Sequence, residues 1–178
     1  SDANSGTSPD APRATIQSIL DDFDLDAGDV IFIDTGEYVL SQTVVIGSGD
    51  AGIELRGAWD DADGDGEVDL DESVLTRISR GTFTEDVVRV SGSSDVTLRS
   101  LDLRGGRDGV SALNADGLQL LGLRLTENDR YGVYVDSGSS GVLVESGLFD
   151  GGVSRRQDYG VYGDTSVGLT VTGSRLLN

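Results

Sequence analysis

The feature that most constrains the fold is a repeat in the second half of the chain. From Val87 onward four segments align, which read VVRVSGSSDVTLRSLDLRGG, GVSALNADGLQLLGLRLTEN, GVYVDSGSSGVLVESGLFDGG and GVYGDTSVGLTVTGSRLLN. Equivalent strand openings fall at Val96, Leu118, Val142 and Leu169, which are 22, 24 and 27 residues apart. A period of this length with alternating apolar positions indicates stacked supersecondary units, as in a solenoid.

Apolar residues occupy equivalent positions in each repeat. One predicted column contains Leu98, Leu120, Val144 and Val171, and another contains Leu103, Leu125, Phe149 and Leu176. Because side chains alternate between the two faces of a strand, each column stacks into a continuous core. Only 6% of the residues are aromatic whereas 26 are Gly, which favours short strands and tight turns over packed helices.

The first half contains one helix and several short strands. Residues 14–23 place Ile16, Ile19, Leu20 and Phe23 on one helical face, and apolar strands are predicted near residues 29–34, 38–40, 43–46 and 52–57. Residues 1–13 are expected to form a flexible polar tail. Residues 14–178 are then expected to form a single domain.

Over residues 14–178 the chain resembles the pectate-lyase-like right-handed β-helix superfamily. The opening GDVIFIDTGEYVLSQTVVI is similar to the first coil of that family, in which an N-terminal helix caps the stack. The resemblance implies an all-β, right-handed parallel β-helix with a short N-terminal capping helix. Leucine-rich repeats are a weaker alternative because their Asn-centred motif is missing, and left-handed hexapeptide helices would have a period of six.

An insertion at residues 58–73 interrupts the early coils. Residues 61–72 read DADGDGEVDLDE and match the twelve-residue calcium loop of EF-hand and dockerin type, including Gly66 at the sharp turn. The expected Ca²⁺ ligands are Asp61, Asp63, Asp65, Glu67, Asp69 and Glu72. Strands rather than helices flank the loop, so we expect a structural role instead of a sensor role. The alternative is an acidic, solvated loop without metal.

Composition excludes several kinds of function. The chain has 32 acidic and 13 basic residues, a net charge of −19, and no Lys, His or Cys. A role in binding duplex nucleic acid is therefore excluded. Disulfides and thiolate metal sites are also excluded, because the chain has no Cys. The acidic surface is either a salt-tolerant coat or a surface that needs divalent cations. No apolar run is long enough to span a membrane.

The same composition bears on catalysis. Enzymes of the family that the chain resembles use His-dependent motifs in galacturonases and mannuronan epimerases, and these motifs are absent here. Asp102, Arg124 and Arg175 are predicted in one outward column and Arg99 and Glu145 in the next, so an Arg base remains conceivable. A solvated ion-pair face explains the same residues. We predict no catalytic residue and lean toward a non-enzyme.

A second outward feature is aromatic. The motif Tyr-Gly-Val-Tyr occurs at residues 131–134 and again at 159–162. We therefore expect Tyr134 and Tyr162 to stack on adjacent coils, with Asp136 and Asp164 beside them. Such a pair either binds sugars or stabilises the solenoid as a stacking ladder.

These observations predict a secreted, non-catalytic, calcium-binding β-solenoid that acts as a structural or self-assembling extracellular subunit of a filament or surface layer. Secretion is expected because the polar residues 1–12 read like the start of a processed exported chain. Leu176 and Leu177 in the last coil favour end-to-end homo-oligomers. The alternative is a polysaccharide-binding or polysaccharide-lyase-like module, and a third reading is a fragment of a longer protein.

Overall fold

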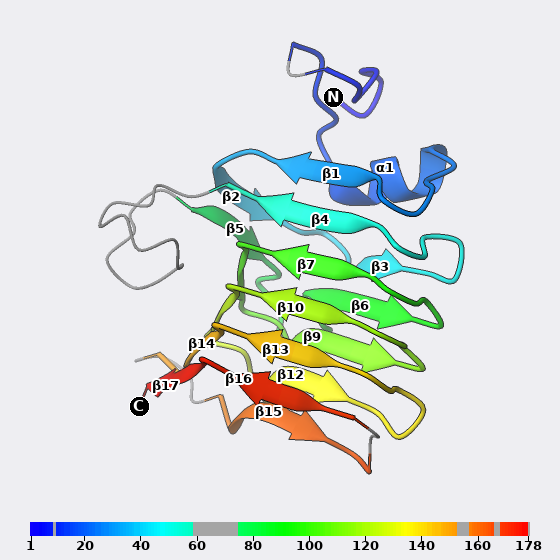
Figure 1. Ribbon diagram of the computed structural model, residues 1–178. Helices are drawn as coiled ribbons and strands as arrows, with labels where there is room; N and C mark the ends of the chain where they lie inside the picture. Colours follow the sequence, from blue (N-terminus) through cyan, green and yellow to red (C-terminus); the bar gives the residue numbers. More distant parts are fainter. Residues whose placement is uncertain (9, 59–74, 153–156, 166–167, 178) are drawn as a thin grey trace.

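Among the described residues, each of the first five coils contributes one strand to each of three parallel sheets and the last coil contributes to two of them, as the computed structural model shows (Figure 1). The structure describes residues 1–8, 10–58, 75–152, 157–165 and 168–177. Sheet A contains β1 (Val30–Ile33), β4 (Glu54–Gly57), β7 (Thr97–Arg99), β10 (Gln119–Leu121), β13 (Leu143–Glu145) and β16 (Thr170–Thr172).

The other two sheets follow the same order along the chain. Sheet B contains β2 (Gly36–Val39), β5 (Thr76–Ser79), β8 (Asp102–Arg104), β11 (Arg124–Thr126), β14 (Leu148–Asp150) and β17 (Arg175–Leu177). Sheet C contains β3 (Val44–Ile46), β6 (Val88–Ser91), β9 (Asp108–Leu113), β12 (Tyr131–Val135) and β15 (Tyr159–Gly163). The predicted right-handed parallel β-helix is confirmed.

The core consists of the predicted apolar columns. Strand register places Leu98, Leu120, Val144 and Val171 side by side in sheet A, and Leu103, Leu125, Phe149 and Leu176 in sheet B. A third column, Val88, Val110, Val133 and Val161, closes the interior from sheet C. The members on inner coils are fully buried, whereas Leu176 on the last described coil is 69% exposed. End-to-end association through this coil stays a prediction.

A short left-handed corner joins sheet A to sheet B in successive coils. Ser100, Gly122, Ser146 and Gly173 occupy this corner with φ values of 55°, 57°, 52° and 60°. A left-handed residue reverses the chain direction within one or two positions, and Gly adopts it without steric cost. Because the corner has the same length in each of these coils, the strands of sheets A and B remain in register.

Helix α1 (Ile16–Asp22) covers the first coil, as predicted. The hydroxyl of Thr15 caps it by accepting a hydrogen bond from the backbone N–H of Ser18 at 3.3 Å. Ile16 and Leu20 are buried in the core, so the helix seals the open end of the stack. Within the described residues no helix is long and apolar enough to cross a membrane.

Candidate functional site

The outer face of sheet C carries many aromatic and charged side chains. An inward-facing glycine, Gly132, explains why two tyrosines of one strand lie on this face. A Cβ atom on Gly132 would lie 2.6 Å from both the Phe149 ring and the carbonyl oxygen of Gly160. Gly132 and the buried Val133 therefore both face the interior. Their neighbours Tyr131 and Tyr134 consequently lie together on the outside, with ring centroids 5.7 Å apart and planes 18° apart.

Four tyrosines form one cluster on two coils. Register pairs Tyr131 with Tyr159 and Tyr134 with Tyr162. The Tyr134 and Tyr162 rings stack with centroids 6.1 Å apart and planes 11° apart, and Tyr131 stacks on Tyr162 at 4.8 Å. The predicted stacking of Tyr134 on Tyr162 is confirmed. Tyr159 is 57% exposed and Tyr162 is 38% exposed, so the cluster presents ring surface to solvent.

The two predicted carboxylates have different environments. Asp136 accepts hydrogen bonds from the Asn114 N–H at 3.0 Å and the Ser139 hydroxyl at 2.7 Å, so it stabilises the turn after β12. Asp164 is exposed on the next coil. Burial raises the pKa of Tyr134, and the charges of Asp164 and Asp136 raise it further. The phenol of Tyr134 therefore stays protonated at neutral pH and can donate a hydrogen bond or a proton.

A ladder of ion pairs lies beside the tyrosines, and sequence reasoning missed it. Asp86 and Asp108 are fully buried under three arginines. Asp108 contacts Arg130 at 2.6 Å and Arg107 at 3.5 Å, and Asp86 contacts Arg107 and Arg89 at 2.8 Å each. The arginine side chains are 33–40% exposed. Buried carboxylates thus hold three guanidinium groups in fixed positions at the surface.

Arg130 connects the ladder to the tyrosines. Its guanidinium carbon lies 4.8 Å from the ring centroid of Tyr131 and 5.9 Å from that of Tyr134, within cation–π range. Burial raises the pKa of Asp108, and the hydrogen bond from Arg130 opposes that rise. The same bond raises the pKa of Arg130. We call the continuous set the arginine–tyrosine surface; its members are Arg89, Arg107, Arg130, Tyr131, Tyr134, Tyr159 and Tyr162.

A hollow of about 390 Å³ continues this surface toward the helical end of the stack. Val45 lies beside Arg89 in the register of β3 and β6, so the hollow lies above the first arginine of the ladder. It is lined by Gln17, Asp21, Gln42, Thr43, Val45, Glu85 and Arg89. The outer face of sheet C therefore offers a polar strip that extends over several coils.

The other predicted outward columns occur on sheets A and B. Asp102 and Arg124 are register neighbours on sheet B, and Leu148 separates Arg124 from Arg175. On sheet A, Leu121 separates Arg99 from Glu145. Each predicted column is interrupted by a leucine. Asp102 is fully buried, so the expectation of a solvated ion-pair face is wrong for this residue.

The predicted calcium ligands lie outside the described residues. These ligands are Asp61, Asp63, Asp65, Glu67, Asp69 and Glu72. Ala58 and Thr76, which lie on either side of these ligands in the sequence, are joined: the Ala58 N–H donates to the Thr76 hydroxyl at 2.7 Å, and the Thr76 N–H donates to the Ala58 carbonyl at 2.9 Å. Among the described residues, no group of three or more acidic side chains is arranged to hold a metal ion.

The chain is similar in fold to solved structures of carbohydrate-active enzymes. An alginate lyase from Paenibacillus sp. matches with a TM-score of 0.61 and 17% identity, over 90% of this chain and 63% of the enzyme. The catalytic domain of an α-1,3-glucanase, solved with tetrasaccharides, matches with a TM-score of 0.55 and 12% identity, over 83% of this chain and 31% of that one. The chain thus spans less than two thirds of either protein.

A mannuronan C-5 epimerase A-module from Azotobacter vinelandii also matches, at 15% identity, over 86% of this chain and 56% of that chain, and its TM-score of 0.38 is too low for a detailed comparison. No protein-family model matches the sequence, and no curated protein is similar to it in sequence.

These matches correct the functional prediction. A non-catalytic structural subunit of a filament or surface layer was the main reading of the sequence. That reading is wrong: the solved structures to which this fold is similar include a lyase and a glucanase that act on polysaccharides, which favours the alternative reading. The sequence suggested assembly because the apolar residues of its last repeat resemble those of an assembly unit. The arginine–tyrosine surface could not be recognised in the sequence, because it depends on contacts between coils.

Proposed function

We propose that this chain is a carbohydrate-active domain that binds an acidic polysaccharide on the arginine–tyrosine surface, with lyase-like elimination as its reaction. One observation carries the proposal: Arg130, which buried Asp108 holds in place, also lies against the exposed tyrosine cluster. Similarity in fold to an alginate lyase supports the reaction class. Because polysaccharides of this kind are extracellular polymers, we also propose that the protein acts outside the cell.

The arginines of this surface suit the carboxylate of an acidic sugar, and the tyrosines suit its ring. Arginine binds carboxylates with paired, charge-assisted hydrogen bonds. Aromatic rings such as Tyr159 and Tyr162 offer flat apolar area with a polar edge, which suits a sugar ring. Since Asp86 and Asp108 already hold the guanidinium groups in place, little side-chain entropy is lost when a ligand binds.

Elimination from a uronic acid requires neutralisation of the carboxylate, removal of the neighbouring C–H proton, and protonation of the leaving oxygen. Arg107 and Arg130 supply the positive charge. Tyr134 is the proton donor that we assign, because its phenol is protonated at neutral pH and its ring lies between Arg130 and the exposed Tyr162. We assign removal of the C–H proton to Asp164, the exposed carboxylate whose charge acts on Tyr134. As the ring double bond forms, the bond to the leaving oxygen breaks and that oxygen takes the proton of Tyr134.

Binding and cleavage should be tested separately with purified protein. Titration with polygalacturonate and alginate should give binding that Arg107→Met and Tyr162→Ala each weaken. Arg56→Met and Phe32→Ala are matched controls, because Arg56 and the 66% exposed Phe32 lie on sheet A. Ultraviolet absorbance of the unsaturated product reports elimination, which Tyr134→Phe should abolish while binding persists. Failure to bind either polymer, or equal losses in the controls, would contradict the proposal.

We also propose that residues 61–72 bind one Ca²⁺ ion through Asp61, Asp63, Asp65, Glu67, Asp69 and Glu72. The support is the sequence: oxygen ligands at loop positions 1, 3, 5, 7, 9 and 12, with Gly66 at position 6, are the donor set that this hard cation prefers. Ion binding would neutralise carboxylates that otherwise repel each other. The role that we assign is structural, since β4 and β5 of the stack are the strands on either side of this segment in the sequence.

A further inference from the structure

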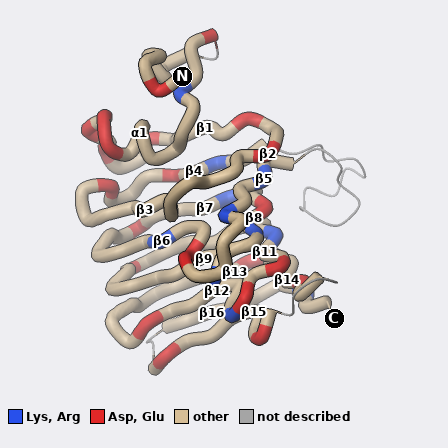
Figure 2. Tube along the Cα trace, turned by 180° about the vertical axis from the view of Figure 1, so that it is seen from behind, with Lys and Arg blue, Asp and Glu red and all other residues tan. Residues whose placement is uncertain are grey.

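A second group of arginines lies on the outer face of sheet B, away from the arginine–tyrosine surface. Arg77, Asp102 and Arg124 are neighbours in one column over three successive coils, and Arg104 lies in the next column beside Thr126. Figure 2 shows basic segments gathered at β5, β8 and β11. In a chain with a net charge of −19, such a concentration of positive charge is conspicuous.

The carboxylate at the centre cannot neutralise this group. Asp102 is fully buried, and it contacts Arg77 Nε at 2.9 Å and Arg104 Nε at 3.7 Å. The Thr126 hydroxyl lies 3.4 Å from Asp102 and accepts a hydrogen bond from Arg104 at 3.2 Å. Two guanidinium groups therefore contact one carboxylate, and Arg124 adds a third positive charge at the neighbouring position in the column.

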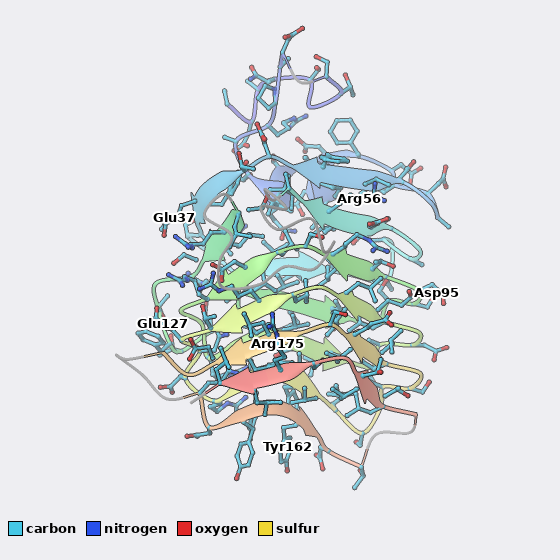
Figure 3. The ribbon with its side chains drawn as sticks, turned by 60° about the vertical axis from the view of Figure 1, so that its left-hand side comes forward. Glu37, Arg56, Asp95, Glu127, Tyr162 and Arg175 are labelled. Carbon is cyan, nitrogen blue, oxygen red and sulfur yellow. The ribbon has the colours of Figure 1, made fainter. Side chains whose placement is uncertain are left out.

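Two exposed or partly exposed carboxylates lie at the edges of the group. Glu127 is 3.9 Å from Arg104, and Glu37 is the register neighbour of Arg77. Figure 3 shows both of these glutamates along one side of the stack. Solvent screens their charges, so they offset the buried part of the arginine group only weakly.

Two donors in this group lack an acceptor. The Nε atoms of Arg104 and Arg124 are buried, and neither makes a hydrogen bond among the described residues. A buried N–H without an acceptor costs free energy, and native proteins rarely leave one. An oxyanion on this face would accept hydrogen bonds from the terminal nitrogens of these guanidinium groups and would meet the unbalanced positive charge of three arginines.

We propose that Arg77, Arg104 and Arg124 form a binding site for a single oxyanion, a carboxylate or sulfate group, on the outer face of sheet B. Asp102 holds Arg77 and Arg104 in place without filling the site. The ligand is either a free inorganic anion or an acidic substituent of a glycan. The inference does not depend on glycan binding at sheet C, because the two faces share no arginine.

Calorimetric titration of the full chain with sodium sulfate, and separately with galacturonate, tests the site at ionic strength held constant with sodium chloride. The wild-type protein should take up about one anion saturably. Arg124→Met should weaken binding at least about tenfold, the equivalent of one lost charge-assisted hydrogen bond. Arg56→Met on sheet A is the control, and it should bind as the wild type does. Asp102→Asn should bind more tightly, because the competing internal anion is removed.

Each outcome decides the proposal. Uptake of sulfate alone identifies an inorganic or ester sulfate, uptake of galacturonate alone identifies a sugar carboxylate, and loss of either in Arg124→Met supports the site. Circular dichroism checks folding, and Arg77→Met replaces Arg124→Met if the latter does not fold. Absence of saturable uptake, or wild-type affinity in both arginine variants, overturns the proposal. Glycan binding at sheet C would be unaffected by that result.

Discussion

Arg130 contributes to both halves of the arginine–tyrosine surface, since it pairs with buried Asp108 and lies over the Tyr131 ring. Removing it should therefore cost stability as well as glycan affinity. We expect Arg130→Met to lower the free energy of unfolding by about 1–3 kcal/mol, because a buried carboxylate loses its closest partner. Arg107 at 3.5 Å and the partial exposure of Arg130 limit the loss. Urea unfolding measures it.

The pH dependence of this variant follows from Asp108. Burial raises the pKa of Asp108 above its ordinary value of 3.8, and loss of Arg130 raises it further. The folded protein then holds a proton that the unfolded chain releases, so stability falls as pH rises through this range. Arg130→Met should consequently lose less stability at acidic pH than at neutral pH. Adding Asp108→Asn should remove most of this pH dependence; an unchanged profile would argue against the pair.

At the scale of the element, Gly132 decides which side chains β12 presents. Gly132→Ala places a Cβ atom 2.6 Å from the Phe149 ring and the Gly160 carbonyl, so either the strand or the ring must move. We expect a loss of about 1–3 kcal/mol, the usual cost of overpacking. Weaker glycan binding should accompany it, because Tyr131 shifts with the strand. Gly49→Ala is the control, since nothing lies within 4 Å of its added Cβ.

This element also shows where prediction from sequence succeeds and where it stops. Leu98, Leu120 and Val144 could be aligned because each repeat preserves their spacing from a left-handed corner. Strict alternation along β12 would place Tyr131 and Tyr134 on opposite faces. The consecutive inward residues Gly132 and Val133 bring both rings to the outside.

The ion-pair ladder could not be predicted from the sequence for a different reason. Arg130 pairs with Asp108 at a separation of 22 residues, across two coils whose turns differ in length. The repeat spacings of 22, 24 and 27 residues fix the core columns, but they leave open which polar side chains outside the columns meet. The signal that sequence reasoning overlooked was an acidic residue, Asp86 or Asp108, at the start of two successive sheet C segments.

The calcium loop makes its own prediction at this scale. The chain should bind about one Ca²⁺, and the combined change Asp61→Ala and Glu72→Ala should abolish uptake in calorimetry. Because hydrogen bonds between Ala58 and Thr76 join the chain on either side of the loop sequence, the variant should keep its β-sheet circular dichroism. Asp95→Ala with Asp116→Ala, on a different turn, controls for the loss of two charges. Unchanged calcium affinity in the loop variant would refute the site.

For the whole molecule, net charge is the dominant property. A charge of −19 on 178 residues destabilises the folded state by self-repulsion. Sodium chloride screens repulsion between surface charges, whereas the buried pairs around Asp86, Asp102 and Asp108 are screened much less. We therefore expect the midpoint of thermal unfolding to rise as sodium chloride increases from low to moderate concentration. A midpoint that falls over this range would show that exposed ion pairs matter more than repulsion.

The closure between Ala58 and Thr76 has a consequence for engineering. Elsewhere, as at Ser100 and Leu101, the chain passes from sheet A to sheet B through a two-residue corner, whereas here Ala58 and Thr76 are hydrogen-bonded although 17 residues separate them in the sequence. The Thr76 hydroxyl also lies within hydrogen-bonding distance of the carbonyl oxygens of Ile33 and Asp34 on the preceding coil, which ties the Ala58–Thr76 pair to the stack. We therefore expect foreign peptides grafted between Ala58 and Thr76 to be displayed without altering the scaffold.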